Sequence, residues 1–300
     1  MTNILKQSTQ IKHRLQRLKN SIDALPLRFF ADKILASAWA KTPPFKLKAN
    51  HSLPQPLIVN LTSFPPRFEQ LHATLKSLLL QHTQPDKLVL WLYEGDMASL
   101  PASVLALTAY GLSIETYKDN IRSYKKLVPA LQQWPDAFHV TADDDVYYRP
   151  DWLTALVSAY RGNHNEVLCL RAHLITRNAQ GEALPYKHWQ KKTAYSGPSR
   201  DLFFTGCSGI FYPPHALHKM TIEPAHFMRL APYADDIWFY WMTLANKGTI
   251  RRVGSNKKII TWPSSNNSSL WAINKSEQQG NDMQFQQVSD FCHANHLIES

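Results

Sequence analysis

The sequence predicts an α/β domain whose central sheet is mainly parallel and covered by helices on both faces. Short apolar runs alternate with segments in which apolar residues recur every three or four positions. Single helices between strands produce right-handed βαβ units, and such units build a parallel sheet. A chain of 300 residues, 44% of them hydrophobic, is also long enough to bury the core of such a domain.

The alternation runs from residue 57 to residue 142. The expected strands are LIVNLT (57–62), KLVLWLY (87–93), LSIETY (112–117) and FHVTA (138–142). The expected helices between them cover residues 67–81, 100–110 and 123–134. A later helix, DDIWFYWMTLA (235–245), carries aromatic residues that we assign mostly to the core. Ligands of parallel sheets bind beyond the carboxyl ends of the strands, so functional residues are expected there.

The positive charge of the chain is concentrated near its N-terminus. The net charge is +10, and residues 1–50 hold ten Lys or Arg against two Asp. Five apolar residues recur there at spacings of four and three, which predicts an amphipathic helix: Ile11, Leu15, Leu18, Ile22 and Leu25. We therefore divide the chain into a basic helical arm with its linker (1–50) and an α/β domain (51–300). The arm can lie on an anionic membrane surface, or it can dock on its own domain or on a second copy.

The composition of the chain indicates in which cellular compartment it works and which partners it binds. Three scattered cysteines without a CxxC pair argue against a disulfide framework or a structural zinc. No apolar run reaches the roughly 18 residues of a membrane span, and the first residues lack a secretion-signal pattern. We expect a cytoplasmic protein, peripheral at the inner face of the membrane if the arm binds lipid. The basic arm lacks interleaved aromatic residues, so no nucleic-acid partner is expected.

Three consecutive aspartates follow the fourth expected strand. Asp143, Asp144 and Asp145 repel one another, so they need water or a cation. In an extended chain Asp143 and Asp145 would share one face while Asp144 points to the other. Two carboxylates on one face suit Mg²⁺ or Mn²⁺ holding a diphosphate, and we count Asp143 and Asp144 among the nucleotide-binding candidates. Alternatively, one aspartate caps the helix that begins near Pro150, which Asp151 could do unaided.

Seven motifs occur in this order in the stretch from Leu57 to about Asp282: LTSFPPRF, LHATLKSLLLQ, SYKKLVPAL, TADDDVYYRPDWL, FFTGCSGIFYPP, ADDIWF and GNDMQ, of which the last runs on to Gln284. In this order they resemble the GT-A glycosyltransferases, most closely a bacterial, family-2-like branch. The resemblance implies a Rossmann-like GT-A fold and transfer of a sugar from a nucleotide-diphosphate sugar to a glycan or lipid-linked acceptor, with inversion. It also implies Mn²⁺ or Mg²⁺ as cofactor and a place in surface polysaccharide or lipopolysaccharide synthesis.

The resemblance further implies roles for individual residues. Asp143 and Asp145 look like its Asp-x-Asp motif, with Asp145 the direct metal ligand and Asp143 contacting metal or ribose. Segment 61–67 resembles the loop that receives the nucleotide base. Asp236 falls where inverting members carry their catalytic acidic residue, and Asp235 is expected to cap the helix or bind an acceptor hydroxyl, unless the two exchange roles. No histidine aligns with the third metal ligand of some members.

The remaining donor-side candidates follow from their own chemistry. Thr62 and Ser63 offer hydroxyls at a strand end, and Arg67 can reach a phosphate. The alternative is a proline-rich turn with a solvated Arg67. Lys126 lies near a helix start that attracts anions, so we assign it to donor binding, whereas Lys125 is interpreted as solvated.

Two later segments supply further candidates. Gly206 and Gly209 mark either an acceptor loop, as the resemblance suggests, or a simple bulge. Cys207 between them has no neighbouring histidine, so we do not interpret it as a nucleophile. The polar segment that ends at Asn281 and Asp282 is interpreted as a closing lid or as disorder, and these two residues are candidates to meet the metal or the diphosphate.

Two other functions stay open on the sequence. A metal-dependent phosphate-processing enzyme, such as a nucleotidyltransferase, would usually need carboxylates from several strands around two metals. A non-catalytic carbohydrate-binding module is favoured only if Asp145 and Asp236 do not share a pocket.

Overall fold

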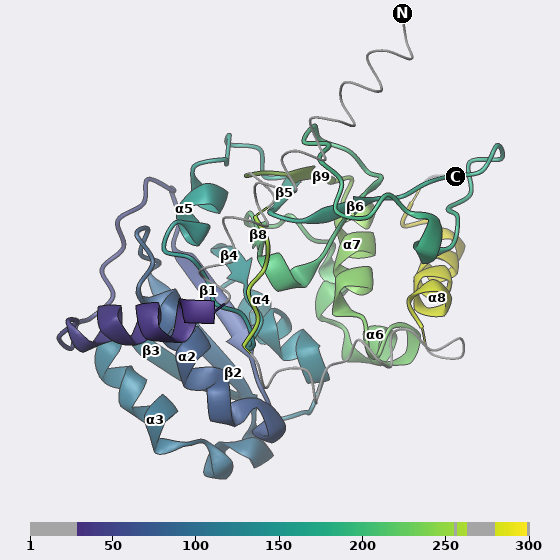
Figure 1. The fold of residues 1–300 in the computed structure, drawn as a ribbon. Helices are drawn as coiled ribbons and strands as arrows, with labels where there is room; N and C mark the ends of the chain where they lie inside the picture. The colour runs from purple at the N-terminus through teal and green to yellow at the C-terminus, as the bar shows by residue number, and fades with distance from the viewer. Residues whose placement is uncertain (1–28, 255–256, 263–279, 299–300) are drawn as a thin grey trace, which may run out of the picture.

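The computed structural model describes residues 29–254, 257–262 and 280–298, and a seven-stranded sheet forms the centre of the protein (Figure 1). Its strands are β1 (Leu57–Thr62), β2 (Lys87–Tyr93), β3 (Leu112–Tyr117), β4 (Phe138–Thr141), β5 (Glu166–Cys169), β8 (Ile210–Tyr212) and β9 (Thr249–Arg252). They lie in the order β3-β2-β1-β4-β8-β5-β9. Of these strands, only β8 runs antiparallel to its neighbours, β4 and β5. The predicted fold class is thereby confirmed.

A second, two-stranded antiparallel sheet joins β6 (Ala172–Leu174) to β7 (Leu202–Phe204). Ala172 pairs with Phe204. Just beyond this pair, the backbone N–H of Thr205 donates to the carbonyl of Arg171 at 3.1 Å. Both side chains line the cavity described below. The small sheet therefore fixes one wall of that cavity.

The helices cover both faces of the large sheet (Figure 1). They are α2 (Phe68–Leu79), α3 (Ala102–Leu105), α4 (Val128–Gln133), α5 (Trp152–Val157), α6 (Pro224–Leu230), α7 (Asp235–Ala245) and α8 (Asn281–Ala294). The helix predicted at 123–134 is divided: Arg122–Lys126 forms a 3₁₀ helix and α4 starts at Val128. Pro129 explains the division, because proline is tolerated in the first turn of a helix but not in its interior.

Two large apolar clusters lie against the sheet. One includes Leu71 and Leu75 of α2 with Leu88 and Leu90 of β2. The other contains most of α7, including Trp238, Tyr240, Trp241 and Met242, whose assignment to the core is confirmed by exposures of 7% or less. Burial of large aromatic and aliphatic side chains stabilises such a core by roughly 1.5–3 kcal/mol for each side chain. This packing places the first turn of α7 at the wall of the cavity described below.

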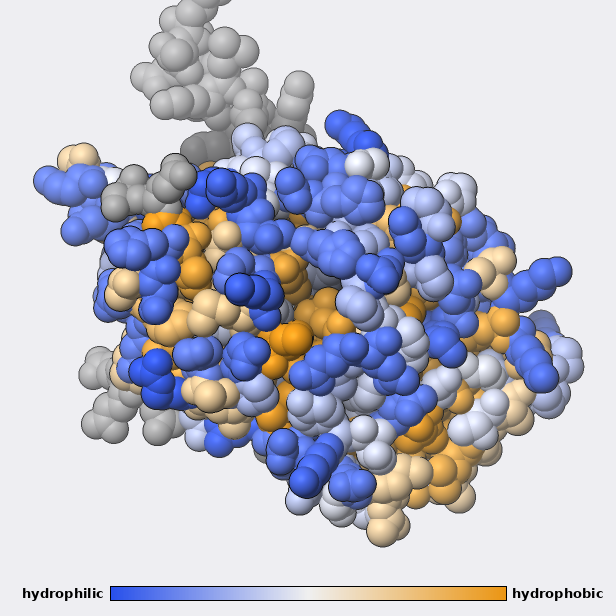
Figure 2. All heavy atoms as spheres, turned by 180° about the vertical axis from the view of Figure 1, so that it is seen from behind, coloured by the Kyte–Doolittle hydropathy of each residue, from blue (hydrophilic) through white to orange (hydrophobic). Residues whose placement is uncertain are grey.

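The described end of the N-terminal arm contacts the α/β domain. Residues 29–40 are helical, and Ala31 and Leu35 pack in one cluster with Tyr147 and Trp262. The apolar stripe from residue 11 to residue 25 lies outside the described residues, so the two interpretations of the arm and the domain boundary at residue 50 stay predictions. Hydrophilic side chains predominate on the face shown in Figure 2, with apolar patches between them. Among the helices that the structure describes, none has the length and hydropathy of a membrane span.

Candidate active site

A cavity of about 620 Å³ opens at the carboxyl ends of β1 and β4. The 3₁₀ helix Arg122–Lys126, the segment after β7 and the start of α7 complete its walls. All nine residues predicted for the site line it: Thr62, Ser63, Arg67, Lys126, Asp143, Asp144, Asp145, Asp235 and Asp236. Segments far apart in the sequence thus meet at the sheet edge where ligands of α/β proteins bind.

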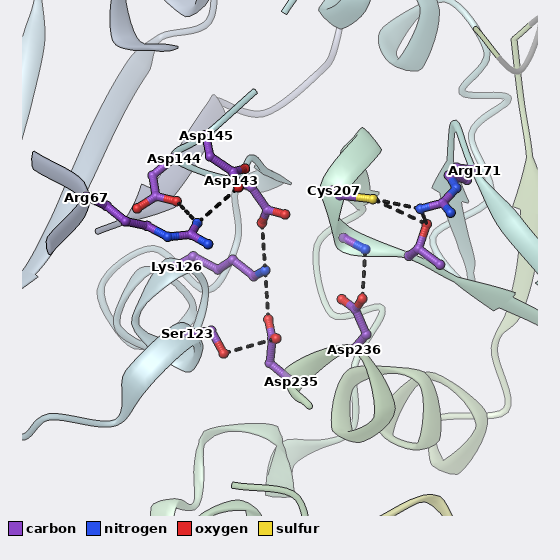
Figure 3. A network of polar contacts seen from close by, with 12 residues as sticks. Arg67, Ser123, Lys126, Asp143, Asp144, Asp145, Arg171, Cys207, Asp235 and Asp236 are labelled. Atoms are coloured by element: carbon purple, nitrogen blue, oxygen red, sulfur yellow. Dashed lines mark hydrogen bonds and ion pairs between the residues drawn. The ribbon is translucent and has the colours of Figure 1, made fainter. Parts of the chain in front are cut away.

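The three aspartates do not alternate between two faces as predicted. β4 ends at Thr141, so Asp143 to Asp145 lie in a turn rather than in an extended strand, and all three line the cavity. Asp143 Oδ1 lies 3.1 Å from Lys126 Nζ, whereas Asp144 and Asp145 both face Arg67 (Figure 3). The expectation that Asp143 and Asp145 form a pair apart from Asp144 was wrong, because strand alternation does not extend into a turn.

Hydrogen bonds from other elements hold this turn in place. Thr74 of α2 donates to the carbonyl of Asp144 at 2.9 Å, and the backbone N–H of Asp143 donates to the hydroxyl oxygen of Tyr148 at 2.7 Å. The Asp144 carboxylate is buried and accepts from Ser63 Oγ at 2.6 Å. Asp144 is therefore fully engaged in holding the site, which leaves its two neighbours more available to a ligand.

Thr62 and Arg67 are also engaged within the protein. The Thr62 hydroxyl donates to the Trp91 carbonyl at 2.8 Å, across β1 and β2. Arg67 Nη1 lies 2.6 Å from Asp144 and 3.2 Å from Asp145, and its guanidinium lies over the Phe64 ring. The side chain of Arg67 is 15% exposed, so the solvated arrangement does not occur. Arg67 instead neutralises part of the charge of the aspartate turn.

Lys126 joins the aspartate turn to the first residue of α7. Its Nζ lies 3.1 Å from Asp143 Oδ1 and 2.8 Å from Asp235 Oδ2, and its side chain is 7% exposed (Figure 3). Burial lowers the pKa of Lys126, but the charges of Asp143, Asp235 and Asp236 outweigh burial and raise it well above the usual value. Lys126 is thus a permanent cation at the centre of the cavity.

Lys125 is buried, so its interpretation as a solvated residue was wrong. It is 2% exposed and donates to Asn120 Oδ1 at 2.8 Å. The 3₁₀ helix packs against β1 and β2, which leaves little room for solvent around its last residues. Burial lowers the pKa of Lys125 to about 8, although the charge of Asp96 raises it.

The two acids of α7 have different environments. Neither side chain caps the helix, so the capping role expected for them does not occur, although both lie in its first turn. Asp235 Oδ1 accepts from Ser123 at 3.0 Å, and its other oxygen meets Lys126. Asp236 Oδ2 accepts from the Gly206 N–H at 2.8 Å, whereas Asp236 Oδ1 is buried and has no hydrogen-bond partner among the described residues. One oxygen of Asp236 therefore remains for a ligand.

The environment of Asp236 raises its pKa to about 7. Burial is the largest cause, and the neighbouring charge of Asp235 adds to it, while Lys126 and the Gly206 N–H oppose it. A carboxylate with this pKa is half protonated near neutrality, which is the range in which general acid–base groups work best.

The two glycines after β7 serve different purposes. A Cβ on Gly206 would lie 2.7 Å from Asp236 Oδ1 and 3.2 Å from Lys126 Nζ, so only glycine lets these side chains approach the backbone. Gly209 has φ of +95°, and a Cβ there would meet the Trp152 ring at 2.6 Å. Gly206 belongs to the site, whereas Gly209 is required by chain geometry and packing.

Replacing Gly206 by Ala is expected to lower the catalytic rate roughly 10²-fold, because the new methyl group displaces Asp236. The folded state should change little, since Gly206 does not have a positive φ. Gly181→Ala is the inverse control: Gly181 has φ of +85° and open space around it, so this variant should lose about 1 kcal/mol of stability at full activity. Wild-type turnover by Gly206→Ala would contradict the placement of Asp236.

Several lining residues were missed by the sequence analysis. They are Asn120, Arg171, Tyr186 and Tyr233. Arg171 stands alone in the apolar run EVLCLRAHL, and an isolated cation in such a run is the one signal that could have revealed it.

The two site candidates near the C-terminus, Asn281 and Asp282, lie in different places. Asn281 lines the cavity, whereas the carboxylate of Asp282 accepts from the backbone N–H of Tyr186 and does not line it. Cys207 lines the cavity, and burial raises the pKa of its thiol, which agrees with its not being a nucleophile. The lid predicted before Asn281 lies mostly at residues 263–279, outside the described residues.

Asp143 and Asp145 are the residues that would hold a divalent cation, together with further ligands such as the oxygens of a diphosphate. Their side chains are 27% and 21% exposed, and burial together with the charges of Asp143 and Asp144 raises the pKa of Asp145 to about 7. A cation would relieve that repulsion. Within the described ranges, no three His, Cys, Asp or Glu side chains are arranged to hold a metal. The other ligands would therefore be phosphate oxygens and water, as is usual for Mg²⁺ sites.

The sequence matches no family model and no curated protein. Among solved structures, it is similar to an inositol-1-phosphate CTP transferase from T. maritima, with TM-score 0.41, 11% identity, and coverage of 84% of this chain and 100% of that one. It is similar to mannosyltransferase PcManGT from Pyrobaculum calidifontis in complex with GDP-Man and Mn²⁺, with TM-score 0.32, 14% identity, and coverage of 54% and 48%.

A third similar structure is glucosyl-3-phosphoglycerate synthase from Mycobacterium tuberculosis in complex with Mn²⁺, UDP and glucosyl-3-phosphoglycerate, with TM-score 0.29, 15% identity, and coverage of 41% of this chain and 50% of that one. The matched part of this chain thus spans about half the length of the mannosyltransferase and of the synthase. Similarity at this level does not indicate a function.

Proposed function

We propose that this protein is an inverting glycosyltransferase that moves a sugar from a nucleotide-diphosphate sugar to a glycan or lipid-linked acceptor. The observation that carries the proposal is the environment of Asp236: one of its oxygens accepts from the Gly206 N–H, and the other has no hydrogen-bond partner among the described residues, in a cavity shared with the aspartate turn. The setting that we propose, a cytoplasmic step of surface polysaccharide or lipopolysaccharide assembly, comes from the sequence resemblance and from the basic N-terminal arm.

The charge of the cavity supports a donor that arrives with a divalent cation. The walls carry five carboxylates, Asp143, Asp144, Asp145, Asp235 and Asp236, and five cationic side chains, Arg67, Arg122, Lys125, Lys126 and Arg171. A diphosphate alone would add negative charge to this balanced set, whereas a diphosphate with Mn²⁺ or Mg²⁺ preserves the balance. Asp143 and Asp145 would hold the cation, which would supply charge neutralisation at the leaving diphosphate.

The chemistry assigned to the protein itself is proton removal and orientation. The acceptor hydroxyl oxygen forms a bond to the anomeric carbon while the bond from that carbon to the diphosphate oxygen breaks and its electron pair leaves with the diphosphate. The hydroxyl proton passes to the free oxygen of Asp236. The Gly206 N–H orients the Asp236 carboxylate, and the positive charge of Lys126 stabilises the negative charges of Asp235 and Asp236.

The two other functions make different demands on the cavity. A silent carbohydrate-binding module was favoured only if Asp145 and Asp236 lay apart, but both line this cavity. A nucleotidyltransferase would join a nucleoside triphosphate to a sugar phosphate and release pyrophosphate. Incubation with a panel of nucleotide sugars and Mn²⁺, UDP-sugars first, tests the proposal by release of nucleoside diphosphate. Pyrophosphate release from CTP or UTP with a sugar phosphate, without nucleotide-sugar turnover, would instead establish the alternative.

Asp145→Asn is expected to weaken Mn²⁺-dependent nucleotide binding at least tenfold, about 1.4 kcal/mol, because it removes a charge that holds the cation against the diphosphate. Calorimetry with UDP and GDP, with and without Mn²⁺, measures the loss. Mn²⁺ alone should bind weakly to the wild-type protein, since the described protein groups supply too few ligands. Equal nucleotide affinity in both proteins would refute the assignment of Asp145.

The turnover number should depend on pH through Asp236. Its pKa is raised to about 7, so below pH 7 the base is protonated and kcat should fall about tenfold per pH unit, reaching a plateau above pH 8. Saturating donor and Mn²⁺ keep Asp145 in its charged, cation-bound form, so kcat then reports on the base. A flat profile between pH 5.5 and 8 would show that no group with this pKa removes the proton.

A further inference from the structure

The cationic side chains of the cavity differ in what they contact. Arg67 and Lys126 form ion pairs with carboxylates. Lys125 contacts an amide oxygen, and Arg122 contacts the Pro232 carbonyl and lies over the Tyr233 ring, all in the wall built around the 3₁₀ helix. Arg171 lies in the opposite wall, next to the small sheet. It therefore needs a separate explanation.

Arg171 has only neutral partners among the described residues. Its Nη1 lies 3.3 Å from Thr205 Oγ1 and 2.9 Å from Cys207 Sγ, and its Nε is buried without a hydrogen-bond partner (Figure 3). Burial raises the pKa of the Cys207 thiol, so the sulfur carries no charge at neutral pH. Buried donors are rarely left unsatisfied, because each costs about 1–3 kcal/mol. Among the described residues, the Arg171 guanidinium thus forms no ion pair with a carboxylate, although it lines the cavity.

The position of Arg171 associates it with the acceptor rather than with the donor. It contacts the residues on either side of Gly206, and Gly206 holds Asp236. In Figure 3 Arg171 and Asp236 lie to the right of Lys126, whereas Arg67 and Asp144 lie to its left and Asp143 lies directly above its amine. A group bound by Arg171 would therefore lie beside the base and away from the diphosphate.

A second cation lies near this end of the cavity. Lys191 Nζ is 2.8 Å from the centre of the Tyr186 ring, and Tyr186 lines the cavity. Burial lowers the pKa of Lys191 to about 8, and the charge of Arg171 contributes to this lowering, against the opposing charge of Asp282. Lys191 thus adds a second positive charge beside Tyr186, and an anion at this end of the cavity would be attracted by it.

We propose that the acceptor carries an anionic group, a phosphate or a carboxylate, which Arg171 binds next to the hydroxyl that is glycosylated. The planar guanidinium presents paired donors that match the oxygens of both groups. The identification of this anion as part of an acceptor rests on the transferase function proposed above. The anion-binding property of Arg171 itself does not.

Titration with inorganic phosphate tests the binding property. With UDP or GDP and Mn²⁺ filling the donor side, Arg171→Gln should bind phosphate at least tenfold more weakly than the wild type. Arg177→Gln is the matched control, because Arg177 follows the same small strand, is exposed and pairs with Asp201 outside the cavity. Its phosphate affinity should be unchanged. Equal phosphate affinity in Arg171→Gln and Arg177→Gln would overturn the proposal.

Arg171→Lys covers the case in which the glutamine variant does not fold. Lysine keeps the charge but lacks the fork, so phosphate affinity should fall between those of the wild type and Arg171→Gln. Affinity unchanged by Arg171→Lys would overturn the bidentate contact. The phosphate titration can also be done without nucleotide, and it then tests anion binding by Arg171 alone. If the protein turned over no nucleotide sugar, the transferase function would be refuted, but the comparison of phosphate affinities between wild type and variants would still hold.

Acceptor probes then distinguish the two anions. Methyl glucoside, the methyl glycoside of glucuronic acid and methyl glucoside 6-phosphate differ only in the group at C6, and transfer to each is compared in wild type and Arg171→Gln. We expect the wild type to prefer one anionic probe at least tenfold in kcat/KM, with the variant losing the preference mainly through KM. If Arg171→Gln still preferred an anionic acceptor, a residue other than Arg171 would bind the anionic group, and the proposal would be overturned.

Discussion

Replacing Asp236 by Asn is expected to lower kcat by roughly 10²–10⁴ while donor affinity and fold are retained. Asparagine is nearly isosteric and its oxygen can still accept from the Gly206 N–H, so the geometry of the first turn of α7 survives. What is lost is the proton acceptor. Steady-state kinetics with a saturating donor measure the loss, and nucleotide calorimetry checks the donor side.

Asp235→Asn distinguishes Asp236 from its neighbour. Both oxygens of Asp235 already contact Ser123 and Lys126, so this variant should lose far less activity than Asp236→Asn. The opposite order of effects would exchange the two roles. The native product should also show inversion at the transferred sugar, since one direct displacement has no covalent intermediate. A retained anomer would exclude Asp236 as the base of a single displacement.

Lys126→Met should reduce the free energy of unfolding by about 3 kcal/mol, the lower end of the range for breaking a buried ion pair. The methionine fills a similar volume but leaves Asp143 and Asp235 without their shared cation. The lower end of the range applies because the side chain of Asp143 is 27% exposed, so water replaces part of the lost interaction. Chemical denaturation of both proteins gives the difference directly.

Lys257→Met provides the control for that variant. Its partner is Asp151, and the two side chains are 44% and 50% exposed, so removing this pair should cost less than about 1 kcal/mol. A loss for Lys126→Met no larger than for Lys257→Met would show that the charges of the cavity are solvated rather than paired.

Much of the fold could be predicted from the sequence because it depends on local patterns. The runs at 57–62, 87–93 and 112–117 are strands with the predicted bounds, since each is an apolar run that fits a buried strand between turn residues. The aspartate turn was placed at the end of a strand for the same reason. A helix boundary was missed where Pro129 moved the start of α4 to Val128.

The sequence indicated which residues form the site, but not which of them contact one another. The chain by itself determined the α/β class and which acidic and basic residues lie at the ends of strands and helices, because hydrophobic period and turn chemistry act over a few residues. Only the tertiary structure decided that Lys126 joins Asp143 to Asp235, and that one oxygen of Asp236 has no hydrogen-bond partner among the described residues. It also decided that Arg171 contacts the two neighbours of Gly206, the residue that holds Asp236. These relations depend on distances between segments up to about a hundred residues apart, which the packing of the sheet sets and no local pattern records.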